Sequence, residues 1–451
     1  MQQNFEGILT THDAKQHLAH TFEMPVGATK LFIKLEYNPH RSTGQPYDNM
    51  LSLTLFDPES CRGARHNNPD QSLVITEYSA TPGYTPGTLQ AGTWTVFIDT
   101  HRILPPDELH YTVDVDISDE PLHETKVQWL KKSVKARGQG WYHGDLHGHT
   151  LHSDAAWDVP DFVQYARNYE LDFVTLTDHN TVSGLTQLDS FAEDDLLTVG
   201  GSELTTYCGH ALALGVRTWQ EWRVGVNNIT MPEIATHVKE KGGVFVIAHP
   251  KSAGDPECTG CDWHYPDMLP GKARHVEIWN GPWAGDSGNE TALELWYQWL
   301  NEGYRMTATA GTDSHGPMRD PNPSFNYVYA KDLTEYDILN AIQQGHLYLS
   351  SGPTLDVMVR NRWLEYATMG DVIAGEDVTL SFYWSGCNQG DTLELIINGG
   401  VFDERVLGER GLLEWRLPQH TRWSVVEVRD KAGNMRAVTN PIFIGSENDW
   451  R

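Results

Sequence analysis

The sequence of 451 residues lacks long apolar runs and is poor in cysteine. No stretch approaches the about 18 continuous apolar residues of a membrane-spanning helix, so we expect no membrane span. The N-terminus, MQQNFEGILTTHDAKQ, has no basic segment followed by an apolar core, and so does not read as a signal peptide. Its 5 cysteines are too few, and odd in number, for a disulfide scaffold. We therefore expect a cytoplasmic protein.

Basic residues are also scarce. Lys and Arg together number 33 against 61 Asp and Glu, for a formal net charge of -28. A field of this sign repels polyanions, so we expect no nucleic-acid duplex as a partner. A small anionic substrate remains compatible with the charge, because bound metal cations reverse the field locally. The composition does not indicate an oligomeric state.

Internal repeats and low-complexity tracts are absent, but the texture of the chain changes twice. Residues 1–120 consist of short alternating runs such as LFIKLEY and TWTVFID, separated by turn clusters such as ATPGYTPG, a pattern typical of a β-sandwich. Residues 121–140 are predicted to be a linker. Runs such as VTLSFYW and TLELIING in residues 354–451 predict a second β-sandwich domain.

In residues 141–353, short apolar strands alternate with helical patterns. DFVTLT, GVFVIA and RMTATAG are typical of strands, whereas VPDFVQYARNY, MPEIATHVKEK and TEYDILNAIQQG are typical of helices. Alternation of this kind predicts an α/β domain with a parallel sheet or a TIM-like barrel, and the segment has about the length of one such domain.

Potential metal ligands follow the strands of this middle segment. The carboxyl ends of barrel strands meet at one rim, where active sites lie, so we expect these side chains to converge there. Imidazole and carboxylate groups suit zinc, iron or manganese, and nine of them are too many for one four-coordinate ion. The pattern therefore predicts two or three divalent ions. The nine residues are His147, His149, Asp154, His179, Glu203, His210, His249, Asp313 and His315.

The stretch HGDLHGHTLHSD, residues 143–154, concentrates these residue types. His147 and His149 are two apart, so in an extended segment both project to the same side and can bind one ion. The spacing recurs at Asp313 and His315. His143 and His152 are out of phase with the pair and are predicted to lie at the surface or behind the ligands. Asp145 is predicted to orient a ligand rather than to bind metal.

The motifs DLHGHTLHSD, LTDHN, GSE, AHP and GTDSH resemble, in this order over about residues 142–316, those of the PHP (polymerase and histidinol phosphatase) metallohydrolases. EIWNG (277–281), LSSGP (349–353) and the late TNPIFIG resemble the carbaryl-hydrolase-like branch of that superfamily. The resemblance implies a distorted (β/α)7 barrel with a centre of two or three metals, and it implies ligand roles for the same nine residues. Ala155 departs from the glycine common at that position.

The predicted activity is hydrolysis by a metal-activated water, most readily of a phosphoester. Glu203 is the candidate bridging ligand, and Asp313 the candidate acceptor of the proton of the attacking water. Asp178 is a candidate to orient that water or to protonate a leaving group. Phosphoesterase activity is common among PHP relatives, but the branch resembled here includes a carbamate hydrolase, so a carboxyl or carbamate ester is the alternative.

Recognition of a phosphate would require cationic donors beyond the metals. Lys251, after AHP, and Arg319, after GTDSHGP, are candidates for contact with a small-molecule ester, as is Asn280 in the segment NGPW. Cys258 and Cys261 form a CTGC that is compatible with a small zinc site, a redox pair or two loop thiols. A hypothesis of a different class is a carbohydrate- or protein-binding module with an inactive barrel.

Overall fold

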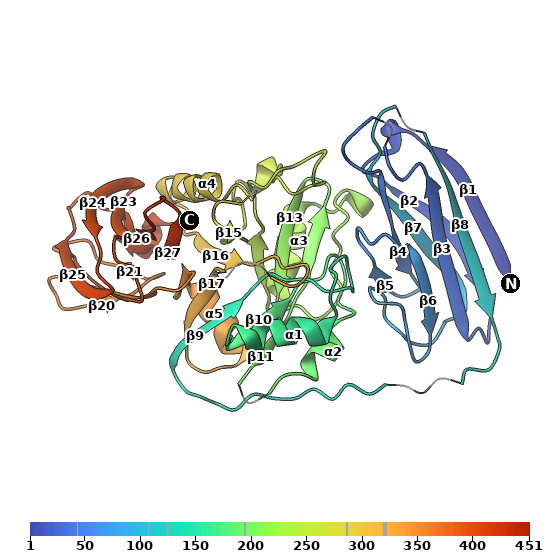
Figure 1. The fold of residues 1–451 in the computed structure, drawn as a ribbon, viewed down its shortest axis with the longest axis horizontal. Helices are drawn as coiled ribbons and strands as arrows, with labels where there is room; N and C mark the ends of the chain where they lie inside the picture. The colour runs from blue at the N-terminus through green and yellow to red at the C-terminus, as the bar shows by residue number, and fades with distance from the viewer. Residues whose placement is uncertain are drawn as a thin grey trace.

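The computed structural model describes residues 1–42, 44–106, 108–123, 125, 127–193, 195–285, 287–318 and 323–451. Most of its regular structure is β-sheet, with few helices. Figure 1 shows the N-terminal strands at one end of the molecule, the C-terminal strands at the other end and the helices between them. Among the described residues, no helix combines the length and the apolar character needed to cross a bilayer.

The N-terminal region consists of two antiparallel sheets whose alternating strands enclose an apolar core. Along β8 every second residue is buried, and Leu31, Leu53, Trp94 and Val113 lie in the core between the sheets. The first sheet has the order β1 (Gln2–Leu9), β8 (Leu109–Ser118), β3 (Lys30–Asn38) and β6 (Ser72–Thr76). The second has the order β2 (His17–Met24), β7 (Gly92–Arg102), β4 (Met50–Phe56) and β5 (Cys61–Ala64). A short 3-10 helix, η1 (Thr11–Asp13), precedes β2.

A long connection joins this region to the next. Its described residues between Ser118 and Gly140 form neither helix nor strand, and Val127, Trp129 and Leu130 are exposed along it. In Figure 1 the connection passes along one side of the molecule to reach β9.

Two sheets make up the middle region. In the first, β9 (Gly140–Asp145), β10 (Phe173–Leu176) and β11 (Leu197–Gly200) are parallel, and β17 (Phe325–Ala330) and β18 (Leu347–Ser350) extend the sheet antiparallel. The second has the order β12 (Glu203–Thr206), β13 (Gly209–Leu214), β14 (Val244–Ile247), β15 (His275–Asn280) and β16 (Thr307–Gly311).

Single parallel bridges connect these two sheets at both sides of the site, Gly148 with Ser314 and His179 with Glu203. The described strands are therefore not joined into one continuous seven-stranded barrel sheet. The physical reason lies in the hairpin of β12 and β13, because its antiparallel pairing with β14 interrupts the parallel order expected of a (β/α)7 barrel.

The longer helices begin where the sequence predicts them. Pro160 and Pro232 lie in the first turns of α1 and α3, where a missing amide donor costs nothing, and both helices begin with a capping box. The five α-helices among the described residues are α1 (Val159–Asn168), α2 (Leu185–Asp189), α3 (Met231–Glu240), α4 (Asn289–Asn301) and α5 (Glu335–Gln344). The 3-10 helices η2 (Val226–Asn228) and η3 (Pro266–Met268) lie in loops.

The C-terminal region continues the first sheet of the middle region, because β18 pairs antiparallel with β27. That sheet goes on through β27 (Met435–Thr439), β26 (Trp423–Arg429), β23 (Thr392–Ile397) and β24 (Gly400–Val406), with β28 (Ile442–Ile444) and β21 (Val372–Ile373) beside it. A separate sheet has the order β20 (Tyr366–Ala367), β19 (Thr354–Arg360), β22 (Thr379–Ser385) and β25 (Arg410–Arg416). The chain ends after η4 (Glu447–Asp449).

Candidate metal centre

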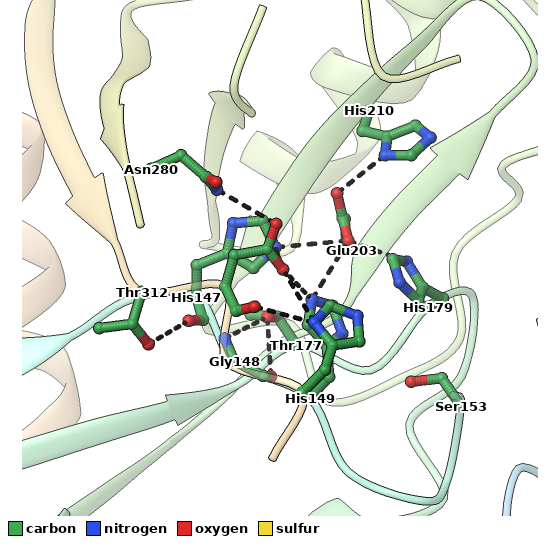
Figure 2. Close-up of polar contacts among 12 residues, drawn as sticks. His147, Gly148, His149, Ser153, Thr177, His179, Glu203, His210, Asn280 and Thr312 are labelled. Carbon is green, nitrogen blue, oxygen red and sulfur yellow. Dashed lines mark hydrogen bonds and ion pairs between the residues drawn. The ribbon is translucent and has the colours of Figure 1, made fainter. Parts of the chain in front are cut away.

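The nine predicted ligands come from strand ends and the loops beside them and lie together in the structure, and Figure 2 labels five of them. His147 and His149 follow β9, His179 follows β10, and His249 follows β14. Their side chains, with those of Asp154, Glu203, Asp313 and His315, form three groups, and within each group the potential ligand atoms lie within 4.8 Å of one another. The groups are His149–Asp154–His179–His315, His147–Glu203–His249 and His147–His149–Asp313.

Glu203 lies at the middle of the cluster and is fully buried. Both carboxylate oxygens face imidazole nitrogens, so this one side chain connects histidines from four loops and strands. Oε1 is 3.1 Å from His210 Nδ1 and 3.1 Å from His249 Nε2. Oε2 is 2.8 Å from His179 Nδ1, 3.3 Å from His147 Nε2 and 3.5 Å from His149 Nε2.

The surrounding contacts turn a ring nitrogen of two histidines toward carboxylates. His147 Nδ1 donates to Glu277 Oε1 at 3.0 Å, and its Nε2 faces Glu203 and, at 3.4 Å, Asp313 Oδ1. His315 Nδ1 donates to the carbonyl of Asp313 at 2.8 Å, and its Nε2 lies 3.2 Å from Asp154 Oδ1. Burial opposes protonation, but the carboxylates raise the pKa of His147 well above its usual range and that of His315 to about 10, so each position favours a positive charge, either a ring proton or a bound cation.

Several buried polar atoms of the cluster have no hydrogen-bond partner in the described part of the chain. They include His147 Nε2, both ring nitrogens of His149, Asp154 Oδ1, Glu203 Oε2, His249 Nδ1 and Asp313 Oδ1. Buried polar groups are rarely left unsatisfied, and such a concentration calls for an explanation such as an ion. The donor set of imidazole and carboxylate fits divalent zinc, manganese or iron.

The electrostatics keep the carboxylates charged. Burial raises the pKa of Glu203, but His179 and His147 outweigh it and hold the pKa well below its usual range. The pKa of Asp313 is likewise held well below normal, with burial opposed by His147 and His149. Burial, with His179 and His315 beside it, lowers the pKa of His149 to about 3. Charged carboxylates and a neutral imidazole are the forms that bind metal.

Glu277 belongs to the site but was not among the predicted residues. It is buried in the middle of β15, a strand with no exposed residue, and it accepts hydrogen bonds from two ligands. Beside His147, the backbone amide of His249 donates to Glu277 Oε2 at 3.1 Å, as does Asn280 Nδ2 at 3.1 Å. The sequence signal that could have identified Glu277 is a carboxylate inside the otherwise apolar run VEIW of a buried strand.

Asn280, predicted to contact substrate, lies beside the cluster and holds a ligand. Its Nδ2 donates to Asp313 Oδ2 at 3.2 Å, and its Oδ1 accepts from Ser287 at 3.0 Å. The amide is thus engaged within the protein, and a direct contact of Asn280 with substrate stays a prediction.

Asp178, predicted to act in proton transfer, lies behind the ligands and faces the loop after β9. Its carboxylate accepts hydrogen bonds from the Thr150 amide at 2.8 Å, from Thr150 Oγ1 at 2.7 Å and from Ser153 Oγ at 2.8 Å. These contacts fix the loop that carries His149 and Asp154. The proton role of Asp178 stays a prediction that this geometry does not favour.

Asp145 is buried and binds backbone around the site, which matches its predicted orienting role. It accepts from Thr312 Oγ1 at 2.5 Å, from the Thr312 amide at 3.1 Å and from the His147 amide at 3.3 Å. Burial raises its pKa to about 6 despite these hydrogen bonds. Asp145 therefore ties the loop after β9 to the loop after β16.

The remaining predicted residues that the structure describes pair with groups other than the ligands. Lys251 is partly exposed, and its Nζ is 3.9 Å from Asp262 Oδ1. Arg319 lies outside the described residues. His143 pairs with Asp172 at 3.0 Å, and His152 lies 2.7 Å from Ser183 Oγ, so neither histidine reaches the ligands.

The two cysteines of the CTGC form a disulfide beside the centre. Cys261 Sγ lies 3.9 Å from His210 Nδ1, and His210 Nε2 donates to the carbonyl of Thr259 at 3.0 Å. His210 is therefore held between Glu203 and this loop. The sequence left three interpretations of the CTGC open, and the structure shows its two cysteines joined by a disulfide.

No family model and no curated protein matches the sequence. Solved structures that are similar in part include the following three. A two-domain protein from Bacteroides vulgatus, containing a predicted PHP-like metal-dependent phosphoesterase, is 16% identical over 70% of this chain and 100% of its own, with a TM-score of 0.39. A protein from Bifidobacterium adolescentis, proposed to be a metal-dependent phosphoesterase, is 17% identical over 44% of this chain and 94% of its own (TM-score 0.27).

The third is an amidohydrolase from Chromobacterium violaceum with bound sulfate and no metal, 15% identical over 39% of this chain and 89% of its own (TM-score 0.27). At TM-scores this low, the three likenesses carry no argument about this chain. The functional interpretation therefore depends on the side chains of the centre.

Proposed function

We propose that the protein is a metal-dependent hydrolase with two or three divalent ions, zinc, manganese or iron, that cleaves a small-molecule ester. One observation carries the proposal. The three ligand groups are linked, because His147 and His149 each belong to two of them, and the buried carboxylate of Glu203 lies between them. Shared ligands place ions close together, as in two-metal hydrolases. The order of the motifs over residues 142–316 supports membership of the PHP superfamily, and EIWNG, LSSGP and TNPIFIG support its carbaryl-hydrolase-like branch.

Each group offers a separate binding position for an ion. His147, Glu203 and His249 would hold one, and His149, Asp154, His179 and His315 another. Asp313, with His147 and His149, would complete or bridge them. Bound divalent ions supply Lewis acidity, which activates water and neutralises charge on an ester oxygen.

Among the carboxylates of the centre, Asp313 is best placed to take a proton. Its side chain is 22% exposed, compared with 0% for Glu203 and 10% for Asp154. Asn280 holds one of its oxygens, and the other has no hydrogen-bond partner in the described part of the chain. We assign the acceptance of the proton from water to Asp313 and support of the loop after β9 to Asp178.

A phosphoester is the first candidate for the bond cleaved, because the PHP resemblance favours it. A carboxyl or carbamate ester is the second, and one observation favours it. Lys251, a cation expected to recognise phosphate, has its Nζ 3.9 Å from Asp262 Oδ1, and within the described part of the chain no ion pair joins it to a ligand carboxylate. Sites that select phosphate usually add cationic donors to the metals.

The test is elemental analysis of the purified protein, followed by assay with p-nitrophenyl phosphate, bis-p-nitrophenyl phosphate and aryl acetate and carbamate esters. We expect two to three ions per chain and turnover of one ester class. The double variant H147A/H149A should lose both metal and turnover. Metal binding without turnover of any ester would instead favour the non-catalytic binding module, and absence of metal would refute the centre.

A further inference from the structure

A loop of the N-terminal region lies against the metal centre. Residues 65–71 connect β5 with β6, and Asn68 Nδ2 donates to the carbonyl of Ser153 at 3.1 Å. A second N-terminal loop binds next to it, where Thr181 Oγ1 donates to the carbonyl of Gly83 at 2.7 Å. The loops that carry Asp154 and His179 are thus covered by a region more than eighty residues earlier in the chain.

Asn67, in the same loop, contacts a candidate ligand directly. Its Nδ2 donates to Asp154 Oδ2 at 3.2 Å, while Asp154 Oδ1 faces His179 and His315. Asn67 has a φ of 48°, a left-handed conformation that is uncommon for residues other than glycine and often found at functional sites. The amide therefore sets the orientation of the carboxylate.

His66 reaches furthest toward the ligands. Its ring centroid lies 4.8 Å from that of His179 and 4.5 Å from that of His101, and only 7% of the residue is exposed. His66 Nδ1 is buried and has no hydrogen-bond partner in the described part of the chain. His101, by comparison, is satisfied through Nε2, which lies 2.6 Å from Ser52 Oγ.

The loop that presents these side chains is braced from within. Gln71 Nε2 donates to the carbonyls of Arg65 and Asn68, both at 2.8 Å, and Gln71 Oε1 accepts from the Leu53 amide at 3.0 Å. A side chain held this way keeps its position when a ligand arrives, and the ordering cost is not paid at binding. A residue that binds a ligand requires a loop that is held in place in this way.

We infer that the N-terminal region supplies part of the active site, with His66 contacting an oxygen of the bound substrate and Asn67 positioning Asp154. The inference rests on the proposed function, in that the substrate is an ester bound at the metal centre. The ring of His66 lies beside that of His179, and its Nδ1 has no partner in the described part of the chain, so it can offer a hydrogen bond to an oxyanion or ester oxygen. The phosphoryl and carboxyl groups share this chemistry.

The experiment uses the full-length, metal-loaded protein and inorganic phosphate as the probe. The variants are H66A, H66F, which keeps the bulk of the ring, and H66Q, which restores a hydrogen-bonding group. N67G preserves the left-handed backbone, and H20A removes a half-buried imidazole of the same region that lies against Tyr111 and Phe5. Phosphate affinity is measured by calorimetry, metal content by elemental analysis, and metal release by transfer to a chelator.

H66A and H66F should keep the wild-type metal content and bind phosphate about tenfold more weakly, the effect of one lost hydrogen bond to a charged group. H66Q should recover part of the affinity. If an ester is turned over, KM should rise more than kcat falls. N67G should release metal to the chelator about tenfold faster. H20A should match wild type in each measurement.

Wild-type phosphate affinity in both folded H66A and H66F would overturn the contact of His66, and so would the loss of metal from these variants. Failure of the wild-type protein to bind phosphate would overturn it as well. Unchanged metal release in N67G would overturn the positioning role. If wild type binds phosphate through His66 but hydrolyses no ester, the hydrolase proposal fails while the contact stands.

Discussion

At the scale of single residues, the orientation of the metal ligands depends on a side chain that is not itself a candidate ligand. Glu277 fixes the tautomer of His147 through Nδ1 and also binds the backbone amide of His249. Two ligands from different loops are thereby aligned by one carboxylate. Outer carboxylates of this kind orient imidazoles and raise their basicity toward metal.

E277Q should lower metal affinity by about 10- to 100-fold while the chain remains folded, because an amide accepts the His147 proton less strongly and presents an NH2 group to one donor. Titration of the metal-free protein with zinc, followed by calorimetry, measures the change. E233Q, on the exposed capping box of α3, is the matched control and should bind as wild type. If E277Q bound zinc with the affinity of the wild type, Glu277 would have no role in orienting the metal ligands.

Residue types and spacing were sufficient to predict that the nine candidate ligands lie together, because the strand ends of an α/β domain meet at one rim. Glu277 and His66 were out of reach by the same reasoning. Glu277 lies inside a strand rather than at its end, and its partner His147 is 130 positions away. His66 belongs to a region with its own core, and the sequence contains no signal that this region docks on the centre.

At the scale of elements, the end of β16 comes very close to the loop after β9. A Cβ on Gly311 would lie 2.2 Å from Glu277 Oε1 and 2.3 Å from His147 Cβ. The packing leaves no room for even one methyl group without moving His147 or its partner.

G311A should therefore destabilise the protein by about 1–3 kcal/mol and weaken metal binding, since Glu277 or His147 must shift. Thermal denaturation and zinc titration measure the two effects. G140A, at the start of β9 with open space around the added methyl, is the matched control. A G311A variant with unchanged metal affinity would show that the approach is looser than the structure has it.

His275 lies at the start of β15, at the end of the strand opposite to Asn280. Its protonation makes the stability of the protein depend on pH. Burial, with Arg274 adding to it, lowers the pKa of His275 to about 4, and Lys239 and Lys272 line the same cavity. The unfolded chain takes up this proton near pH 6.5, whereas the folded chain does so near pH 4. Stability should therefore fall as pH decreases through this window.

The variant H275Q should show a shallower loss of stability, by about 3 kcal/mol in total, between pH 6.5 and 4. Urea denaturation at several pH values, compared with wild type, isolates the contribution of this one group. Parallel curves for the two proteins would mean that the pKa of His275 is not lowered in the folded state.

The hairpin of β12 and β13 is the element that the sequence did not reveal. GSE suggests a strand end followed by a ligand loop, but Glu203 begins a new strand, β12, that turns back at residues 207–208 into β13, which in turn pairs with β14. A strand of four residues with Thr205 and Thr206 buried has no clear alternation. Tertiary pairing, rather than local pattern, decides its conformation.

At the scale of the whole molecule, the predicted boundary at residue 353 cuts a sheet that is continuous in space. Ser350 of β18 pairs with Ala437 of β27, so the middle and C-terminal regions share backbone hydrogen bonds. The strand texture of both regions was readable, but pairing between distant strands was not. The division into separate domains there stays a prediction.

Metal removal should affect the stability of the entire chain, because the cluster joins loops from both sheets of the middle region. Without cations, the buried carboxylate oxygens and imidazole nitrogens of the cluster face one another with no metal between them. Saturating zinc or manganese at about a thousand times the dissociation constant should add about 4 kcal/mol to the free energy of unfolding. Thermal scans before and after chelation, then after metal is returned, measure it, with H147A/H149A as the unresponsive control.

The extended connection after β8 has a consequence for how the N-terminal region remains on the centre. A tether of this length keeps two surfaces at an effective concentration in the millimolar range, so even a weak contact between them stays closed most of the time. The polar contacts made by Asn67, Asn68 and Gly83 need not provide the attachment by themselves, since Arg223 also lies over the rings of Phe56 and Phe97. Their chemistry is therefore free to serve recognition of the ligand instead of adhesion.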